Sequence, residues 1–177
     1  SSAIYLFLIT IRDFFISKNK NLSQNIAHFG FSLLILSILF NSLFSSEIIT
    51  NLKVGQTFEN TKAKIVFESL SQKEGENYKS IIGNFIVQDS KGKIENLSPE
   101  LRIYNQPNIT TSEADIKTTL LSDKFIVINL VQNQDFFNVR YQVKPFMLWI
   151  WISVILISFG GLISFIKKEY ELSLIHI

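Results

Sequence analysis

The chain contains no cysteine, and it has only two histidines, one methionine and three prolines among its 177 residues. Without cysteine it can form no disulfide, zinc ribbon, iron–sulfur site, C-x-x-C redox pair or covalent c-type haem attachment. Charge is also scarce, because Asp, Glu, Lys and Arg make up 18% of the residues and the formal net charge is +2. So small a charge neutralises few phosphates, which argues against a nucleic-acid-binding protein.

Apolar residues are abundant, at 47% of the chain with a mean hydropathy of +0.25, which excludes a disordered protein. They gather in two blocks, residues 26–44 and 146–166, that contain no Asp, Glu, Lys or Arg. Each block is long enough to cross a hydrocarbon core of about 30 Å as a helix. The alternative is two buried core helices of a soluble protein, but too few residues remain to cover both.

The flanking charges predict an orientation for these two spans. By the positive-inside rule, cationic residues near the ends of spans face the cytoplasm or the mitochondrial matrix. We therefore expect residues 45–145 on the outer side, in the periplasm if the membrane is the bacterial inner membrane; the alternative is the mitochondrial inner membrane. Trp149 and Trp151 would then lie near the outer end of the second span. The flanking cations are Arg12, Lys18, Lys20, Lys167 and Lys168.

The chain begins and ends with a short, largely apolar segment, residues 1–10 and 172–177. Residues 1–25 read as the end of a preceding helix followed by an inside loop, so the chain is expected to be a fragment, and residues 167–177 as an inside tail. The last six residues, from Leu172 to Ile177, can be encoded by the mosaic-end sequence of a transposon-based sequencing adapter. We expect them to be a translated adapter, in which case His176 carries no meaning. The alternative is a genuine apolar tail.

The segment between the spans alternates short β-type runs with turn signals. This pattern predicts an α+β membrane protein in which two transmembrane helices flank an extracytoplasmic antiparallel β domain, a small sandwich or barrel. One short helix is expected near residues 111–121. The predicted strands are residues 63–68, 80–88, 94–97, 101–104, 124–130 and 136–143.

The same segment offers no catalytic residue. It has no histidine, no cysteine and no acidic pair in a convincing arrangement. Its charges of both signs are interspersed, which is typical of a solvated surface. Replacement of Lys93 or Lys124 by alanine is expected to have little effect on the function of the protein.

His28 is the one candidate ligand, because an ionisable side chain inside a membrane helix is costly to bury without a partner. Ala27, Gly30, Ser37 and Asn41 recur at helical spacing and predict a stripe for close helix packing. We expect His28 to lie beside this stripe, where the small residues would let a flat group approach. A neutral imidazole is a normal axial ligand of haem iron. The alternative is an interfacial histidine that is hydrated or bonded to another helix.

Several short motifs, in order along most of the chain, resemble the C-terminal part of the CcmF-type haem lyases of cytochrome c maturation (the CcmF/CycK/NrfE family). Each is weak by itself, and their order and their placement relative to both spans carry the resemblance. Ser112 and Asn129 depart from the family pattern, which prefers Thr and Gly there. The motifs are Ala27-His28-Phe29-Gly30, Ser46-Glu47-Ile48-Ile49, Leu52-Lys53-Val54-Gly55-Gln56, Gly75-Glu76-Asn77-Tyr78, Pro99-Glu100-Leu101-Arg102-Ile103-Tyr104, Glu113-Ala114-Asp115-Ile116, Val139-Arg140, Lys144-Pro145, Ile150-Trp151 and Gly160-Gly161.

The resemblance implies that His28 is an axial ligand of a membrane-embedded haem b that receives electrons from quinol. The family forms thioethers between haem vinyl groups and the cysteines of apocytochrome c. Its haem-handling segment and other histidine ligands lie upstream, so this chain is not expected to be active alone. Implied partners are haem, a haem chaperone, apocytochrome c and a thiol-handling maturation subunit. Arg102, Arg140 and Lys144 could meet haem propionates, although structural ion pairing is favoured.

A second reading assigns no chemistry to the chain. It describes a non-enzymatic membrane module in which the two helices anchor an outer β domain that binds a partner. A third reading is a bare structural membrane subunit. His28 separates these hypotheses, since only the first requires it to bind haem.

Overall fold

The chain is described from a computed structural model that defines residues 2–16, 22–90, 92–131 and 134–175, with side chains up to Lys167. Within these residues it divides into two units. The helical unit comprises the described residues of Ser1–Ser45, Thr119–Ser122 and Lys144–Ile177. The second unit, Ser46–Thr118 and Asp123–Val143, is built of strands.

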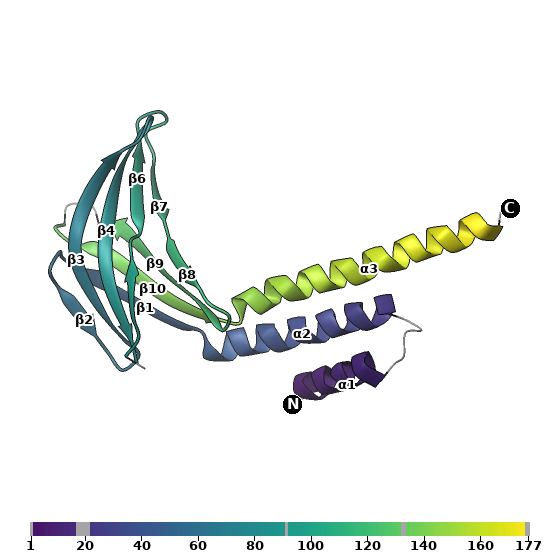
Figure 1. Ribbon diagram of the computed structural model, residues 1–177. Helices are drawn as coiled ribbons and strands as arrows, with labels where there is room; N and C mark the ends of the chain where they lie inside the picture. Colours follow the sequence, from purple (N-terminus) through teal and green to yellow (C-terminus); the bar gives the residue numbers. More distant parts are fainter. Residues whose placement is uncertain (1, 17–21, 91, 132–133, 176–177) are drawn as a thin grey trace. The chain divides into compact units, whose positions relative to one another are not determined.

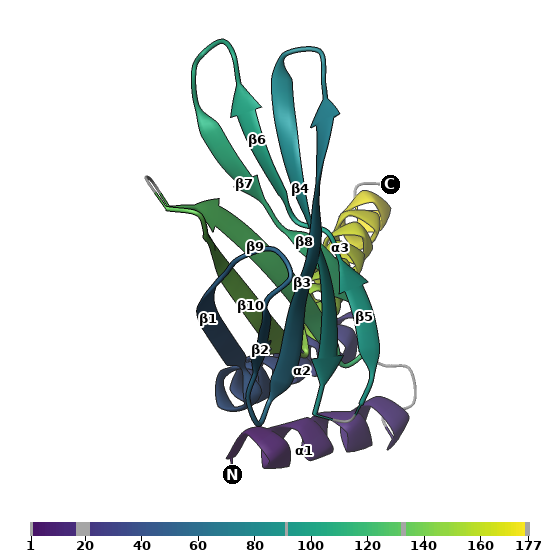
Figure 2. The same cartoon turned by 90° about the vertical axis from the view of Figure 1, so that its left-hand side faces the viewer.

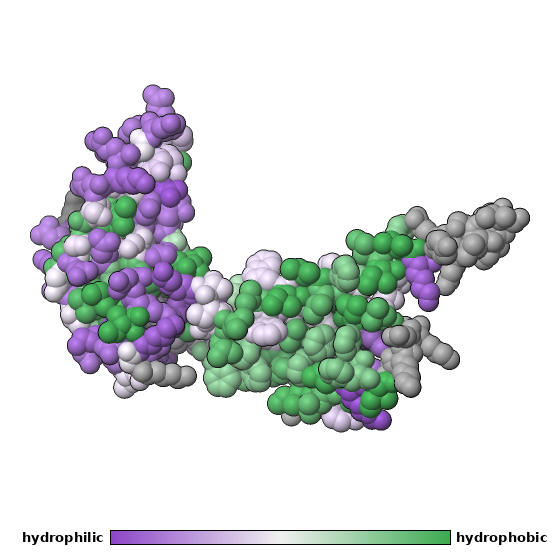
Figure 3. Space-filling model, in the orientation of Figure 1, coloured by the Kyte–Doolittle hydropathy of each residue, from purple (hydrophilic) through white to green (hydrophobic). Residues whose placement is uncertain are grey.

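Three helices form the helical unit: α1 (Ser2–Ile16), α2 (Leu22–Phe44) and α3 (Met147–Ile175) (Figure 1). α2 and the Met147–Lys167 part of α3 have mean hydropathies of 1.8 and 2.2 and are long enough to cross a membrane. Within an 18-residue stretch of each segment, only 22% and 11% of the residues are buried, unlike the core helices of a soluble protein. Apolar side chains accordingly cover the visible face of this unit in Figure 3.

The strands form two antiparallel sheets, which confirms the predicted sandwich. One sheet has the order β1-β10-β9-β8, and the other has the order β2-β3-β4-β6-β7 with β5 also paired to β4. The strands are β1 (Ser46–Leu52), β2 (Thr57–Glu59), β3 (Ala63–Glu74), β4 (Tyr78–Asp89), β5 (Ile94–Leu97), β6 (Glu100–Tyr104), β7 (Thr110–Glu113), β8 (Asp115–Thr118), β9 (Ser122–Leu130) and β10 (Phe137–Pro145).

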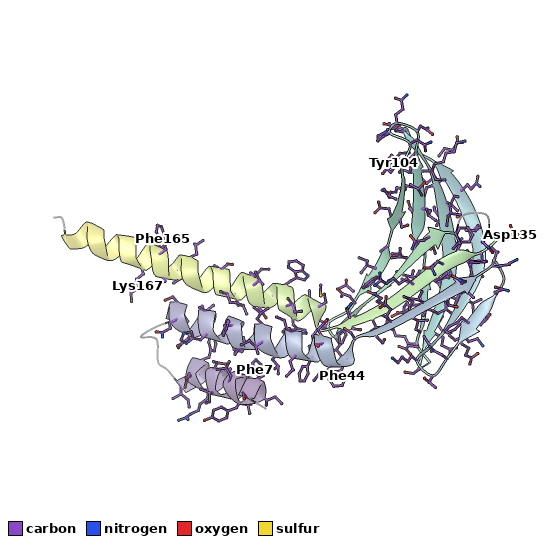
Figure 4. All side chains as sticks on the ribbon, turned by 180° about the vertical axis from the view of Figure 1, so that it is seen from behind. Phe7, Phe44, Tyr104, Asp135, Phe165 and Lys167 are labelled. Carbon is purple, nitrogen blue, oxygen red and sulfur yellow. The ribbon has the colours of Figure 1, made fainter. Side chains whose placement is uncertain are left out.

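Alternate side chains of both sheets fill one core. In β3 and β4 the side chains of Ile65, Phe67, Phe85 and Val87 are at most 1% exposed, and the rings of Phe67 and Phe85 stack with centroids 4.3 Å apart. β4 is long enough to pair with β6 along its first half and with β5 along its second. The hairpins β3–β4 and β6–β7 extend beyond the rest of the sandwich in Figure 2, and Tyr104 lies toward that end in Figure 4.

The predicted helix near residues 111–121 is wrong. The segment forms β7 in one sheet and β8 in the other, so the chain crosses between sheets at Ala114. Its Thr- and Ser-rich sequence has no period-3.6 apolar face, and pairing with β6 and β9 decides its conformation. The short strands β1 and β2 were likewise absent from the sequence prediction.

Candidate functional site

Small residues bring α2 and α3 into close contact. A Cβ atom on Gly160 would lie 2.8 Å from the backbone nitrogen of Ala27 and from the backbone oxygen of Ser23. A Cβ on Gly30 would lie 3.0 Å from the backbone nitrogen of Ile157. The predicted stripe is thus a helix-packing face, because only residues without a bulky side chain let the two backbones approach this closely.

The two helices are also tied at one end. The Asn41 side-chain amide donates a hydrogen bond of 2.7 Å to the Pro145 carbonyl, and the Phe40 and Phe146 rings lie 5.1 Å apart. A side-chain amide within a membrane span is costly to leave without a partner, and the Pro145 carbonyl accepts its hydrogen bond. Asn41, a costly polar residue in a span, therefore has a structural role.

α1 covers a second side of α2. Phe29 of α2 lies between two α1 rings, 5.8 Å from Phe7 and 5.9 Å from Phe14 by centroids. The hydroxyls of Thr10 and the buried Ser32 are 2.7 Å apart and share a hydrogen bond. Ser32 and Phe29 are therefore occupied in helix packing.

His28 lies on a third side of α2, where its side chain is exposed. The expectation that it lies beside the stripe is wrong: residues two apart on a helix differ by about 200° in direction, so His28 points away from Gly30. α3, not a flat group, occupies the space next to the small residues. No hydrogen bond to His28 occurs among the residues that the structure describes.

The exposed side of α2 around His28 is otherwise apolar toward the helix centre. Phe31, one turn on, is 54% exposed, and Ile38 is 51% exposed. Gln24, one turn before His28, is also exposed. No cluster of three His, Cys, Asp or Glu residues suited to a metal ion occurs within the described ranges. Among the described residues, His28 is therefore a single histidine on an exposed, mostly apolar side of α2.

The arginines of the sandwich are engaged in ion pairs. Arg102 contacts Glu100 at 3.1 Å and lies 5.2 Å from the centre of the Tyr78 ring, so its pKa is raised chiefly by its hydrogen bond to Glu100. Arg140 pairs with Glu47 across β1 and β10. These contacts agree with the structural interpretation. For Lys144, no ion pair is found in the described part of the chain.

The sandwich contains a buried ion cluster that no sequence pattern predicted. Lys124, with a side chain 9% exposed, lies 3.1 Å from Asp89 and 3.0 Å from Glu95, and Lys93 lies 2.7 Å from Glu95. Burial alone would lower the Lys124 pKa, but its hydrogen bonds to both carboxylates outweigh burial and the pKa is raised. Lys124 is thus not a solvated surface residue, contrary to the expectation from charge pattern.

The same balance acts on the acidic partner. Burial tends to raise the pKa of Glu95, but hydrogen bonds from Lys93 and Lys124 outweigh it and the pKa is lowered. Nearby, burial raises the pKa of Tyr141 to about 12. The cluster joins β4 and β5 of one sheet to β9 of the other, so we assign it to the stability of the sandwich.

Known proteins resemble this chain in sequence and fold. Residues 43–145 match the family model described as the CcmF C-terminal beta-sandwich. The cytochrome c-type biogenesis protein CcmF of Pseudomonas fluorescens is 29% identical over 84% of this chain and 22% of its own length. Its Escherichia coli counterpart is 25% identical over 82% of this chain and 22% of its own length.

A third relative, the cytochrome c-type biogenesis protein ccl1 of Rhodobacter capsulatus, is 33% identical over 67% of this chain and 18% of its own length. The chain thus spans about a fifth of the relatives that it matches. A solved structure, the cytochrome c haem lyase CcmF, shares the fold with a TM-score of 0.64 at 15% identity. That likeness covers 90% of this chain and 28% of the solved chain.

Proposed function

The chain belongs to the CcmF family of cytochrome c-type biogenesis proteins, and from this premise we propose that His28 supplies one axial ligand to a b-type haem held within the membrane. The observation that carries the proposal is the position of His28. It is a histidine in an apolar membrane helix, its side chain is exposed, and neither α1 nor α3 engages it.

The residues around His28 fit a haem. A neutral imidazole can bind iron only if its nitrogen lone pair is not already used, and His28 has no hydrogen bond within the described residues. Phe31 and Ile38 offer apolar surface on the same side of α2 to the faces and edges of a macrocycle. An ionisable residue in such a place is best explained by a partner from outside this chain.

Different residues of the chain would then have different roles in holding the haem. His28 would hold the iron from one side, the apolar side of α2 would exclude water, and the α2–α3 contact at Gly30 and Gly160 would fix the helix that carries the ligand. A haem b bound there supplies one-electron transfer, here from quinol. The second ligand and the groups that handle the haem substrate belong to the longer protein.

We further propose that the longer protein is a haem lyase that joins haem covalently to apocytochrome c. The sandwich would face the periplasm of a bacterial inner membrane and meet apocytochrome c, a haem chaperone and a thiol-handling subunit. Relatives named as cytochrome c-type biogenesis proteins support this role. The flanking cations support the orientation.

The test is a comparison of His28→Ala with wild type in the full-length protein purified in detergent. We expect the reduced-minus-oxidised spectrum of a b-type haem in wild type and its loss or clear weakening in the variant. Added imidazole should restore part of the spectrum, because it replaces the missing ligand without repairing any helix contact. Covalent haem on cytochrome c in cells should fall in parallel.

Gln24→Ala is the matched control, since Gln24 is exposed one turn away on the same side of α2. It should keep both spectrum and maturation. The proposal is wrong if the full-length wild type carries no haem, or if His28→Ala keeps the spectrum and normal maturation. The chain would then be an anchored partner-binding module.

A further inference from the structure

The turn Thr119–Ser122, which joins β8 to β9, belongs to the helical unit rather than to the sandwich. Two hydrogen bonds tie it to the start of α3. The Trp149 indole donates to the Leu120 carbonyl at 2.7 Å, and the Phe146 amide donates to the Leu121 carbonyl at 2.8 Å. The turn is therefore placed relative to the helices by specific contacts.

The turn is also closed on itself. The Thr119 amide and hydroxyl both donate to the Ser122 carbonyl, at 3.0 and 2.7 Å, and the Ser122 amide donates to the Thr119 hydroxyl at 3.1 Å. These bonds occupy the polar groups at its base. What it presents outward is the pair of leucine side chains at its tip.

Leu120 and Leu121 are 69% and 65% exposed. Turns are normally built from Gly, Pro, Asn, Asp and Ser, so two adjacent exposed leucines are unexpected in a turn that faces water. The end of α2 is equally apolar, with Leu43 and Phe44 each 64% exposed. The Asn41–Pro145 and Phe40–Phe146 contacts place this end of α2 beside the start of α3.

We propose that this turn is a membrane-interface anchor, whose leucines lie in the headgroup–acyl boundary of the leaflet that the N-terminal end of α3 enters. Leu120 and Leu121 form the tip of the turn. The occupant is phospholipid because the tip continues the apolar surface of two membrane helices at their ends. Trp149, which holds the turn, has the amphipathic ring that is enriched at this depth.

The anchor would give the chain a contact with phospholipid that does not follow from its membership of the family. Through the tip, the connection between β8 and β9 rests on the bilayer at the same depth as the helix ends. This contact does not depend on haem binding, and it is tested without it.

The experiment uses the full-length protein in nanodiscs of palmitoyl-oleoyl phosphatidylcholine and phosphatidylglycerol, on a background without other cysteines. Leu120→Cys and, separately, Leu121→Cys carry a bimane label. Quenching is compared between a headgroup nitroxide lipid, lipids with the nitroxide at acyl carbon 5 or 12, and aqueous iodide. Ile155→Cys, in the middle of the α3 span and 67% exposed, marks the bilayer interior, and Ile94→Cys, 62% exposed on β5, marks the sandwich surface.

Labels at both tip positions should be quenched about twofold more by the headgroup and carbon-5 nitroxides than by the carbon-12 nitroxide. The Ile155 position should show the reverse order, and the Ile94 position should respond to iodide alone. Quenching of the tip by iodide alone would place the turn in water, and quenching by none of the probes would place it under another protein segment. Either result overturns the proposal.

Discussion

Lys124→Ala provides the sharpest test of the structure, because its partners stay behind when it is removed. Glu95 is 9% and Asp89 is 22% exposed, and both lie within 3.1 Å of the Lys124 ammonium. Breaking a buried ion pair on one side costs about 3–5 kcal/mol. Lys93 still neutralises Glu95, and Asp89 is partly hydrated, so we expect a loss of about 2–3 kcal/mol in the free energy of unfolding of the sandwich.

The assay is hydrogen–deuterium exchange of β5 and β9 in the whole chain in detergent micelles. A loss of about 2–3 kcal/mol should speed exchange of the protected amides by about 30- to 150-fold. Lys93→Ala is the matched control. Lys93 also contacts Glu95, but its side chain is 57% exposed, and an exposed pair contributes about 0–1 kcal/mol.

The pH dependence of the two proteins should differ in size. In wild type the lowered pKa of Glu95 contributes stability above its unfolded value near 4.5, which is lost as the pH falls through the folded value. In Lys124→Ala the two carboxylates lose the cation that they share, so their pKa values rise relative to wild type and protonation costs the variant less stability. The difference between the proteins should therefore shrink as the pH falls toward 4. Equal, small effects of Lys124→Ala and Lys93→Ala at pH 7 would refute the buried cluster.

Two further changes probe the helix contact and the core. Gly160→Ala should lower the free energy of unfolding of the helical unit in micelles by about 1–3 kcal/mol, because its methyl group would lie 2.8 Å from the α2 backbone. Gly161→Ala, whose methyl group would meet open space, should leave that free energy unchanged. Equal losses of stability in the two variants would contradict the packing of α2 against α3. Tyr141→Phe should be nearly neutral at pH 7, because the buried Tyr141 hydroxyl has no hydrogen-bond partner in the described residues. Wild type should lose stability between the ordinary tyrosine pKa of 10.0 and about 12, and an unchanged alkaline loss in Tyr141→Phe would rule out this cause.

Length and composition were sufficient to predict both membrane helices, and short β-type runs between turn signals predicted six of the strands, although not β1 or β2, which also contribute to the core. Both signals are local, since a span of apolar residues or an alternating run can be recognised without its neighbours. β7 and β8 could not be found this way, because their Thr- and Ser-rich sequence gains its conformation from partners far along the chain.

The site illustrates the same limit. Spacing placed the small residues on one face of the helix, but only the position of α3 shows that this face packs against α3 and that His28 lies on another side. Likewise, the interspersed charges did not indicate that Lys124 is buried, because its burial depends on contacts with β4 and β5. Ser112 and Asn129, the two departures from the family pattern, turn out to hydrogen-bond each other at 2.6 Å between the sheets.

The register of β1 and β10 has a mechanical consequence. Ser46 pairs with Val143, so the first and last residues of the strand-built unit are neighbours at the same end of one antiparallel ladder. A force that pulls Ser46 and Val143 apart through the chain would load that ladder one residue pair at a time, in the unzipping direction, rather than in shear across all its bonds together. The sandwich would thus yield at low force from its β1–β10 edge while its central strands stay intact.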